Sequence, residues 1–252
     1  MMLSRAETKA LYDKISKFYD LLSEHTEGPV REAGLRMLAP QPGETVLEIG
    51  FGTGHALVWL ARAMGPSGKV YGIDLSDGML AVAQSLVRRE GVGDRVDLRI
   101  GDGTHLPYPS DSVDGVFMSF TLELFDAAEI PVVLAESKRV LKSAKRRDPR
   151  AATQESNSAD EERGGAPPLA RPHQGGGRIV VVGMSKEGEH GLIYEAYEWT
   201  HQHFPNFVDC RPIQVAETLA AAGFHVTGKQ NRRIWVPMEI VRAEKITAPE
   251  SR

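Results

Sequence analysis

The sequence lacks the cysteines that a disulfide framework or a thiolate-based metal site would need, because Cys210 is its only cysteine. It also lacks an excess of positive charge: 30 lysines and arginines stand against 34 aspartates and glutamates, which gives a formal net charge of -4 at pH 7. A surface that follows a nucleic-acid backbone usually needs a basic excess. We therefore do not expect nucleic acid as a partner.

Long apolar runs are missing as well. Nowhere do about 18 consecutive apolar residues occur, so no helix of membrane-spanning length is expected. The stretch Met1–Tyr19 carries charges throughout and has no apolar run of the kind found in a secretory signal. These absences favour a cytoplasmic protein, and they leave peripheral contact with a membrane open.

What the sequence does contain is a globular composition, with 41% apolar and 25% charged residues over 252 positions. Apolar runs alternate with helical patterns, which is typical of βα units around a parallel sheet. We expect an α/β fold with a Rossmann-like, seven-stranded, mostly parallel sheet, helices on both faces and a terminal antiparallel strand pair. The expected strands are Thr45–Ile49, Lys69–Asp74, Arg95–Ile100, Ser112–Ser119, Arg178–Gly183, Phe224–Gln230 and Arg233–Val241. The expected helices are Ala56–Met64, Asp77–Glu90, Ile130–Lys142 and Pro212–Ala222.

The pattern divides the chain into an N-terminal helical lid over residues 1–40 and a ligand-binding domain over residues 41–252. Within the lid, Tyr12–Tyr19 has an amphipathic helical pattern. Residues 143–177 contain almost no large apolar side chain, so we expect a disordered insertion, or alternatively a loop that binds a partner. Residues 185–211 are rich in aromatics and histidines, which suits the wall of a substrate pocket.

A glycine turn follows the first expected strand. Gly50, Gly52 and Gly54 are spaced G-x-G-x-G, whereas dinucleotide-binding turns usually read G-x-G-x-x-G. Glycines allow a tight turn and a close approach of the backbone to a ligand. Glu48, two positions before the first glycine, suits a ligand with a cationic group. The alternative is a purely structural turn in an unrelated α/β protein.

Two further aspartates follow expected strands. Asp74 ends the second strand, where a carboxylate can accept hydrogen bonds from both ribose hydroxyls of an adenosine. The alternative for Asp74 is a helix cap, although Ser76 or Asp77 could cap that helix instead. Asp102 follows the third strand and could accept from an adenine amino group beside Gly103, or could simply form a turn.

Four stretches together resemble a known family: VLEIGFGTGH, VYGIDLSDGML, GDGTHLPYPSDSVDGVFMSF and GGGRIVVVG. They are similar to class I methyltransferases dependent on S-adenosylmethionine (SAM), specifically the type 11 group that includes menaquinone and ubiquinone biosynthesis enzymes. The resemblance covers roughly Thr45 to Gly183. The polar insertion separates two parts of the sequence, RVLK and GGRI, that are usually almost continuous in this group.

The resemblance implies SAM as cofactor and S-adenosylhomocysteine as product. It implies that Glu48 and the three glycines line the methionine end of SAM and that Asp74 binds the ribose. The other implied cofactor contacts are Leu75 and Met79 near the adenine, Asp102 and Gly103 on the adenine, and Ser119 facing the transfer centre.

The class of methyl acceptor can be narrowed by excluding the motifs of enzymes that methylate DNA. An Asn/Asp-Pro-Pro-aromatic motif, usual in amino-methylating DNA enzymes, does not follow the fourth strand, and Cys210 is outside the position of a cytosine-methylating nucleophile. A small-molecule or lipid-like acceptor is therefore favoured, with a quinone precursor as one candidate. The catalytic candidates are Tyr194, His201 and His203, with His105 as a further possible base. We expect no metal site, because His201 and His203 are two positions apart and lack partner carboxylates at ligand spacing.

Three alternatives remain open from the sequence: methylation of a phospholipid headgroup or other small amine, a SAM-binding protein without catalysis, and a nicotinamide dehydrogenase. The glycine spacing argues against the last. The sequence gives no indication of oligomeric state.

Overall fold

The computed structural model describes residues 27–144, 176–185, 212–233 and 236–246. Several expectations lie outside these residues: the amphipathic stretch Tyr12–Tyr19, nearly all of the insertion, and the pocket-wall segment with Tyr194, His201 and His203. Among the described residues, no helix combines the length and the apolar content needed to cross a membrane.

One seven-stranded sheet organises the described chain, in the order β3-β2-β1-β4-β5-β7-β6. The first five strands in that order are parallel, and β7 runs antiparallel to both of its neighbours. The fold class expected from the sequence is therefore confirmed. The strands are β1 (Thr45–Ile49), β2 (Lys69–Asp74), β3 (Val96–Ile100), β4 (Gly115–Ser119), β5 (Arg178–Met184), β6 (Phe224–Arg233) and β7 (Pro237–Lys245).

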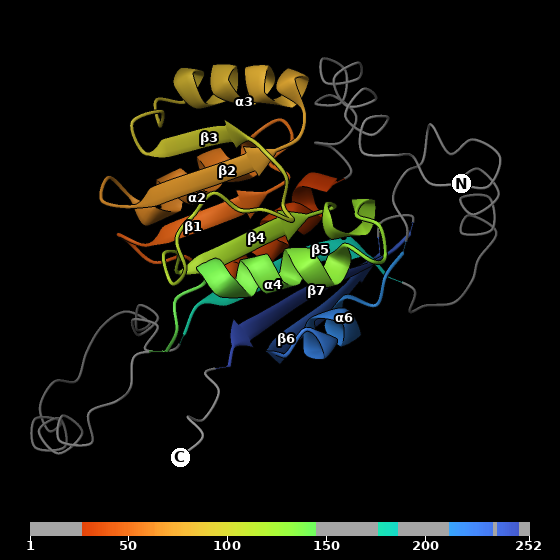
Figure 1. The fold of residues 1–252 in the computed structure, drawn as a ribbon. Helices are drawn as coiled ribbons and strands as arrows, with labels where there is room; N and C mark the ends of the chain where they lie inside the picture. Colours follow the sequence, from red (N-terminus) through yellow and green to blue (C-terminus); the bar gives the residue numbers. More distant parts are fainter. Residues whose placement is uncertain (1–26, 145–175, 186–211, 234–235, 247–252) are drawn as a thin grey trace, which may run out of the picture.

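Helices cover both faces of the sheet. Figure 1 shows α4 across the front of the sheet and α2 behind it. The helix at residues 27–38 packs on the same face as α2 and α3, whereas α6 packs on the face of α4. The labelled helices are α2 (His55–Met64), α3 (Asp77–Arg89), α4 (Ile130–Val140), α6 (Val215–Ala221) and the short 3-10 helix η1 (Leu122–Leu124).

Strand β5 shows how the sheet separates two cores. All seven of its residues are buried. Val180 and Val182 join the cluster beneath α2, while Ile179 and Val181 join the cluster beneath α4. Side chains alternate between the two faces of a strand, so a central strand covered on both sides must be apolar at almost every position. The run Ile-Val-Val-Val in the sequence is the direct consequence.

The boundaries differ from expectation mainly at the closing strand pair. The last strand is Pro237–Lys245 and not Arg233–Val241, and β6 continues to Arg233. The register explains the difference, because β7 pairs with the whole of β5 from Met238 opposite Met184 to Glu244 opposite Arg178. This long-range pairing, which local patterning does not reveal, decides where the strand begins.

Smaller shifts occur at other ends. The fourth strand begins at Gly115 and not Ser112, the helix after it ends at Val140 and not Lys142, and α6 begins at Val215 and not Pro212. Element ends commonly differ by a few residues, because they depend on capping and tertiary contacts.

A buried arginine fixes the helix at residues 27–38 to the sheet. Arg178, only 2% exposed, donates hydrogen bonds to the backbone oxygens of Leu38 (2.7 Å) and Ala39 (3.1 Å), at the C-terminal end of this helix. It also pairs with the carboxylate of Glu44. The carbonyls at the end of a helix have no partner within the helix, so a cation there satisfies them directly.

The two sides of the insertion meet at the base of the sheet. The backbone N–H of Gly177 donates to the oxygen of Lys142 at 2.6 Å, although 35 positions (177 minus 142) separate the two residues. The Gly177 oxygen in turn accepts from the N–H of Lys245 in β7 at 2.9 Å. The chain therefore leaves and re-enters the core at nearly the same place.

Candidate functional site

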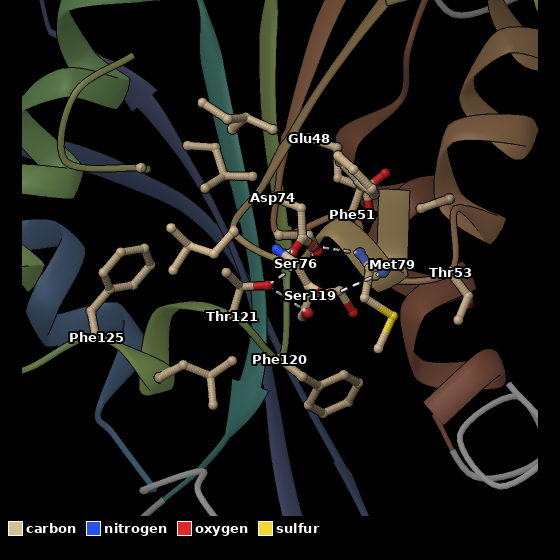
Figure 2. A pocket seen from close by; sticks show the side chains of 18 of the residues that line it. Glu48, Phe51, Thr53, Asp74, Ser76, Met79, Ser119, Phe120, Thr121 and Phe125 are labelled. Atoms are coloured by element: carbon tan, nitrogen blue, oxygen red, sulfur yellow. Dashed lines mark hydrogen bonds between the residues drawn. The ribbon is translucent and has the colours of Figure 1, made fainter. Parts of the chain in front are cut away.

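A cavity lies at the carboxyl ends of β1, β2 and β4. Its walls come from the turn after β1, the start of α2, the loops after β2, β3 and β4, and the helix at residues 27–38. In Figure 2, Asp74, Ser119 and Thr121 lie near the centre of the view, with Phe125 on one side and Met79 and Thr53 on the other. This edge, where the strand order reverses beside β1, is where open α/β sheets bind ligands.

Glycine is favoured at the three positions of the turn for different structural reasons. All have positive φ: 72° at Gly50, 51° at Gly52 and 91° at Gly54. A Cβ on Gly50 would lie 2.4 Å from the Thr121 side chain, and one on Gly54 would lie 2.9 Å from Ala83. A Cβ on Gly52 would meet nothing within 4 Å. Gly50 and Gly52 line the cavity, whereas Gly54 does not and instead lets α2 pack closely against α3.

Asp74 connects the second strand to the turn. Its Oδ2 accepts a 2.9 Å hydrogen bond from the Gly52 N–H, and its Oδ1 accepts one of the same length from the Ser76 N–H. The cap of α3 is Ser76, whose hydroxyl accepts from the Met79 N–H at 3.0 Å. The alternative role of Asp74 as the helix cap is therefore wrong. An ionised carboxylate has about four acceptor positions, so Asp74 can hold the turn and still accept from a ligand.

Glu48 presents a buried acidic group to the same cavity. Its residue is 2% exposed, and its Oε2 has no hydrogen-bond partner among the described residues. Burial raises the pKa of this carboxyl well above its usual value, the positive charge of Arg31 lowers it, and the negative charge of Asp74 raises it further. Buried polar atoms are normally hydrogen-bonded. An unpartnered carboxylate oxygen here indicates a ligand with a donor.

The two candidate residues in the loop after β3, Asp102 and Gly103, differ in their position relative to the cavity. Gly103 lines the cavity, and a Cβ there would lie 3.0 Å from both Ile49 and Phe125. Asp102 is not among the lining residues. Its Oδ1 accepts from the backbone N–H and from the hydroxyl of Thr104, both at 2.9 Å. The structure thus shows a turn-forming role for Asp102, and its contact with an adenine stays a prediction.

Ser119 ends β4 at the cavity, and its buried Oγ has no partner among the described residues. The next residue, Phe120, has φ of 53°, which is unusual for a bulky side chain. Its backbone N–H donates to the Val182 oxygen at 2.8 Å, and its side chain also lines the cavity. Backbone strain of this kind persists where the surroundings impose it, commonly at functional sites.

Of the ten predicted cofactor residues, eight therefore line one cavity, the exceptions being Gly54 and Asp102. Leu75 and Met79 are among the eight. His105 is exposed, and it is not among the lining residues; its ring Nδ1 lies 3.2 Å from the Thr104 hydroxyl. The predicted binding roles stay predictions, since the structure shows placement alone.

Sequence reasoning missed several lining residues. His55 and Phe120 are the last residues of two of the quoted motifs, so their position along the chain could have indicated them. Arg31 and Glu27 lie in the segment expected to form a lid, where no motif distinguishes them. The main residues missed are Glu27, Arg31, His55, Phe120, Thr121 and Phe125.

Comparison with known proteins agrees with this geometry. Residues 46–144 match the model of a methyltransferase domain. The chain is 34% identical over 138 residues to a demethylmenaquinone methyltransferase of Symbiobacterium thermophilum, a match that covers 53% of this chain and 54% of that protein. It is 31% identical over 149 residues to a 2-phytyl-1,4-naphtoquinone methyltransferase of Synechococcus elongatus, covering 58% and 63%. The chain thus spans little more than half the length of the relatives it matches.

A solved structure, a SAM-dependent methyltransferase from Aquifex aeolicus, superimposes with a TM-score of 0.61 at 22% identity, covering 93% of this chain and 98% of that one. At this identity the likeness establishes the fold.

Proposed function

We propose that this chain, which carries a class I methyltransferase domain, transfers a methyl group from SAM to a small lipid-like acceptor of the quinone-precursor class. The observation that carries the proposal is the convergence of Glu48, Asp74 and Ser119 on one cavity at the carboxyl edge of the sheet. The cavity lies largely within the residues that match the methyltransferase domain.

The acceptor groups of the cavity fit the chemistry of SAM. The unpartnered Oε2 of Glu48 suits the ammonium group, and Asp74 suits the ribose hydroxyls. Leu75 and Met79 supply apolar surface for the adenine. When bound, SAM supplies a methyl group that is already activated by the positive charge on sulfur.

The protein's own contribution is then alignment and exclusion of water. Phe120 and Phe125 place aromatic surface in the cavity, and Thr121 stabilises the turn at the end of β4 by donating to the Ser119 oxygen at 3.0 Å. A hydroxyl acceptor also requires a base to remove its proton. Tyr194, His201 and His203 are our candidates for that role.

The acceptor class is inferred from the relatives, whose names describe methylation of demethylmenaquinone and of a phytyl naphthoquinone. A Lys- or Arg-rich surface is not needed for such a neutral, apolar molecule, which agrees with the formal net charge of -4. Because a substrate of this type is lipid-like, we also propose that the protein makes peripheral contact with a membrane.

The test begins with calorimetric titration of the purified protein with SAM, S-adenosylhomocysteine and NAD. Micromolar binding of the first two, and none of NAD, is expected. Methyl transfer from radiolabelled SAM is then compared for a reduced demethylated naphthoquinone and for vesicles containing phosphatidylethanolamine. Label in the quinol supports the proposal. Label in the amine lipid alone would replace the acceptor, and binding without any transfer would indicate a SAM-binding protein.

A further inference from the structure

The cavity has an uneven distribution of charge. Five carboxylate residues line it, but only one arginine or lysine among the described residues does so. SAM itself carries two positive groups, the ammonium and the sulfonium, and one negative carboxylate. An acidic cavity therefore suits the cations, and the carboxylate needs a specific partner. The five are Glu27, Glu48, Asp74, Asp126 and Glu129, and the single permanent cation is Arg31.

We propose that Arg31 binds the carboxylate of the amino-acid end of SAM while Glu48 binds its ammonium group. The inference rests on the proposed use of SAM, and it assigns a cofactor-binding role to the helix at residues 27–38. This helix lies before the matched methyltransferase domain, which begins at residue 46.

The two side chains belong to the same cavity. Arg31 and Glu48 both line it, and the charge of Arg31 lowers the pKa of the Glu48 carboxyl. An α-amino acid group is a zwitterion whose opposite charges are separated by a single carbon. A guanidinium and a carboxylate that sense each other's charge across one cavity are complementary to it. The planar guanidinium can also bind a carboxylate through two parallel hydrogen bonds.

The helix that carries Arg31 is held firmly. Leu35 and Leu38 are 2% and 0% exposed, and a Cβ on Gly34 would lie 2.4 Å from the Val182 side chain, so the helix packs directly on β5. Arg178 binds the chain at its end, and Arg242 donates to the Met37 oxygen at 3.1 Å. A charge carried on a fixed helix loses little further freedom when it binds a ligand.

A competing site for the carboxylate is the start of α2, where His55 and the backbone of the first helical turn also border the cavity. The guanidinium differs from this site in carrying a full positive charge at every accessible pH. Variants of the two residues therefore distinguish the alternatives.

The experiment measures calorimetric affinities of the full chain for three ligands: SAM, decarboxylated SAM and methylthioadenosine. The second lacks only the carboxylate, and the third lacks the whole amino-acid end. Arg31→Gln is expected to weaken binding of SAM by about tenfold or more, since a hydrogen bond between charged groups contributes roughly 1.5–3 kcal/mol. The affinities for the two ligands without a carboxylate are expected to change by less than about twofold.

Arg36→Gln is the matched control, because Arg36 lies on the same helix but forms an exposed pair with Glu32. It should leave all three affinities unchanged. Arg31→Lys, which keeps the charge but loses the paired donors, should give an intermediate loss and also serves if Arg31→Gln fails to fold.

Three results would overturn the inference. Equal weakening of all three ligands by Arg31→Gln would show a purely structural effect. Unchanged SAM affinity in Arg31→Gln, combined with a selective loss in His55→Ala, would move the carboxylate to the start of α2. If the wild-type chain bound decarboxylated SAM as tightly as SAM, no carboxylate site would exist. Failure of the wild-type chain to bind any of the three would instead refute the proposed function, and with it this inference.

Discussion

The backbone N–H of Gly52 donates a 2.9 Å hydrogen bond to Oδ2 of Asp74, which joins the turn after β1 to the end of β2. Gly52 has positive φ and no neighbour within 4 Å of where a Cβ would lie, so its backbone conformation, and not close packing, favours glycine here. The carboxylate of Asp74 therefore shapes the turn in addition to any contact with a ligand. Two separate motifs of the sequence form a single unit.

Replacing Asp74 by alanine should weaken SAM binding by roughly 30-fold, because about 2 kcal/mol is lost with a charged acceptor. The free protein should remain folded. Its melting temperature should fall by only a few degrees, roughly as expected for the loss of the two hydrogen bonds that Asp74 accepts from backbone N–H groups. Titration calorimetry and thermal melting check both parts. Asp97→Ala, which removes an exposed pair with Arg99, is the control and should alter neither. Unchanged affinity in a folded Asp74 variant would remove Asp74 from the site.

The motif residues could be predicted because they follow strands, and the carboxyl ends of parallel strands meet at one edge. Glu48, Asp74 and Ser119 reach the cavity for this reason. Arg31 could not be predicted, since its place depends on how a helix outside the motifs packs over β5. The start of β7 was also missed, because its pairing with β5 fixes it from a distance.

Glu48→Gln should have opposite effects on stability and binding. Burial raises the pKa of Glu48 in the folded protein, so the charged form opposes folding and the neutral amide should stabilise the free chain at neutral pH. The amide cannot supply the negative charge that suits an ammonium group, so SAM should bind at least about tenfold more weakly. Melting curves without ligand and titration with SAM are the measurements. Losses in both stability and affinity would show that Glu48 is a structural residue.

A second buried carboxyl, Glu123, should make stability depend on pH. Its residue is 0% exposed, Oε1 accepts from the Met184 N–H at 3.2 Å, and Oε2 has no partner among the described residues. Burial raises its pKa to about 7, partly opposed by hydrogen bonds from backbone N–H groups. The folded state thus favours the protonated form. This stabilising contribution is fully present below the unfolded pKa of about 4.3 and is lost as pH rises through 7.

In the wild-type protein, the free energy of unfolding should therefore fall by up to roughly 3 kcal/mol between about pH 4.5 and pH 7. Glu123→Gln should remove this fall. Urea unfolding at several pH values measures it, with the exposed Glu32→Gln as the control. Wild type and Glu123→Gln should differ little at pH 4.5, and the variant should be the more stable at pH 8. Parallel pH profiles for the two proteins would contradict the raised pKa.

Arg178→Ala should destabilise the fold by about 3–5 kcal/mol, as expected when one partner of a buried ion pair is removed. The substitution removes the cation that pairs with the Glu44 carboxylate and the guanidinium donor to the oxygens of Leu38 and Ala39. The Glu44 carboxylate and the Ala39 oxygen then keep only the hydrogen bonds from Gln41. Chemical denaturation gives the magnitude. Arg36→Ala, which breaks an exposed pair, should cost less than about 1 kcal/mol. Similar small losses for both arginines would mean that water replaces the Arg178 contacts.

Replacing residues 145–175 by a short glycine-serine bridge should leave the melting temperature unchanged or slightly higher. The two sides of the replaced stretch are already joined, since the Gly177 N–H bonds to the Lys142 oxygen at 2.6 Å and the Gly177 oxygen accepts from Lys245. A bridge therefore needs to span little distance, and shortening the loop should favour folding by roughly 1–2 kcal/mol through a smaller closure entropy. A second variant, with a glycine-serine linker of the original length, separates the effect of length from that of sequence. A melting temperature more than about 5 °C below that of wild type corresponds to a loss of well over 1 kcal/mol of stability. If both variants showed such a loss, residues 145–175 would have to stabilise the core through their own contacts.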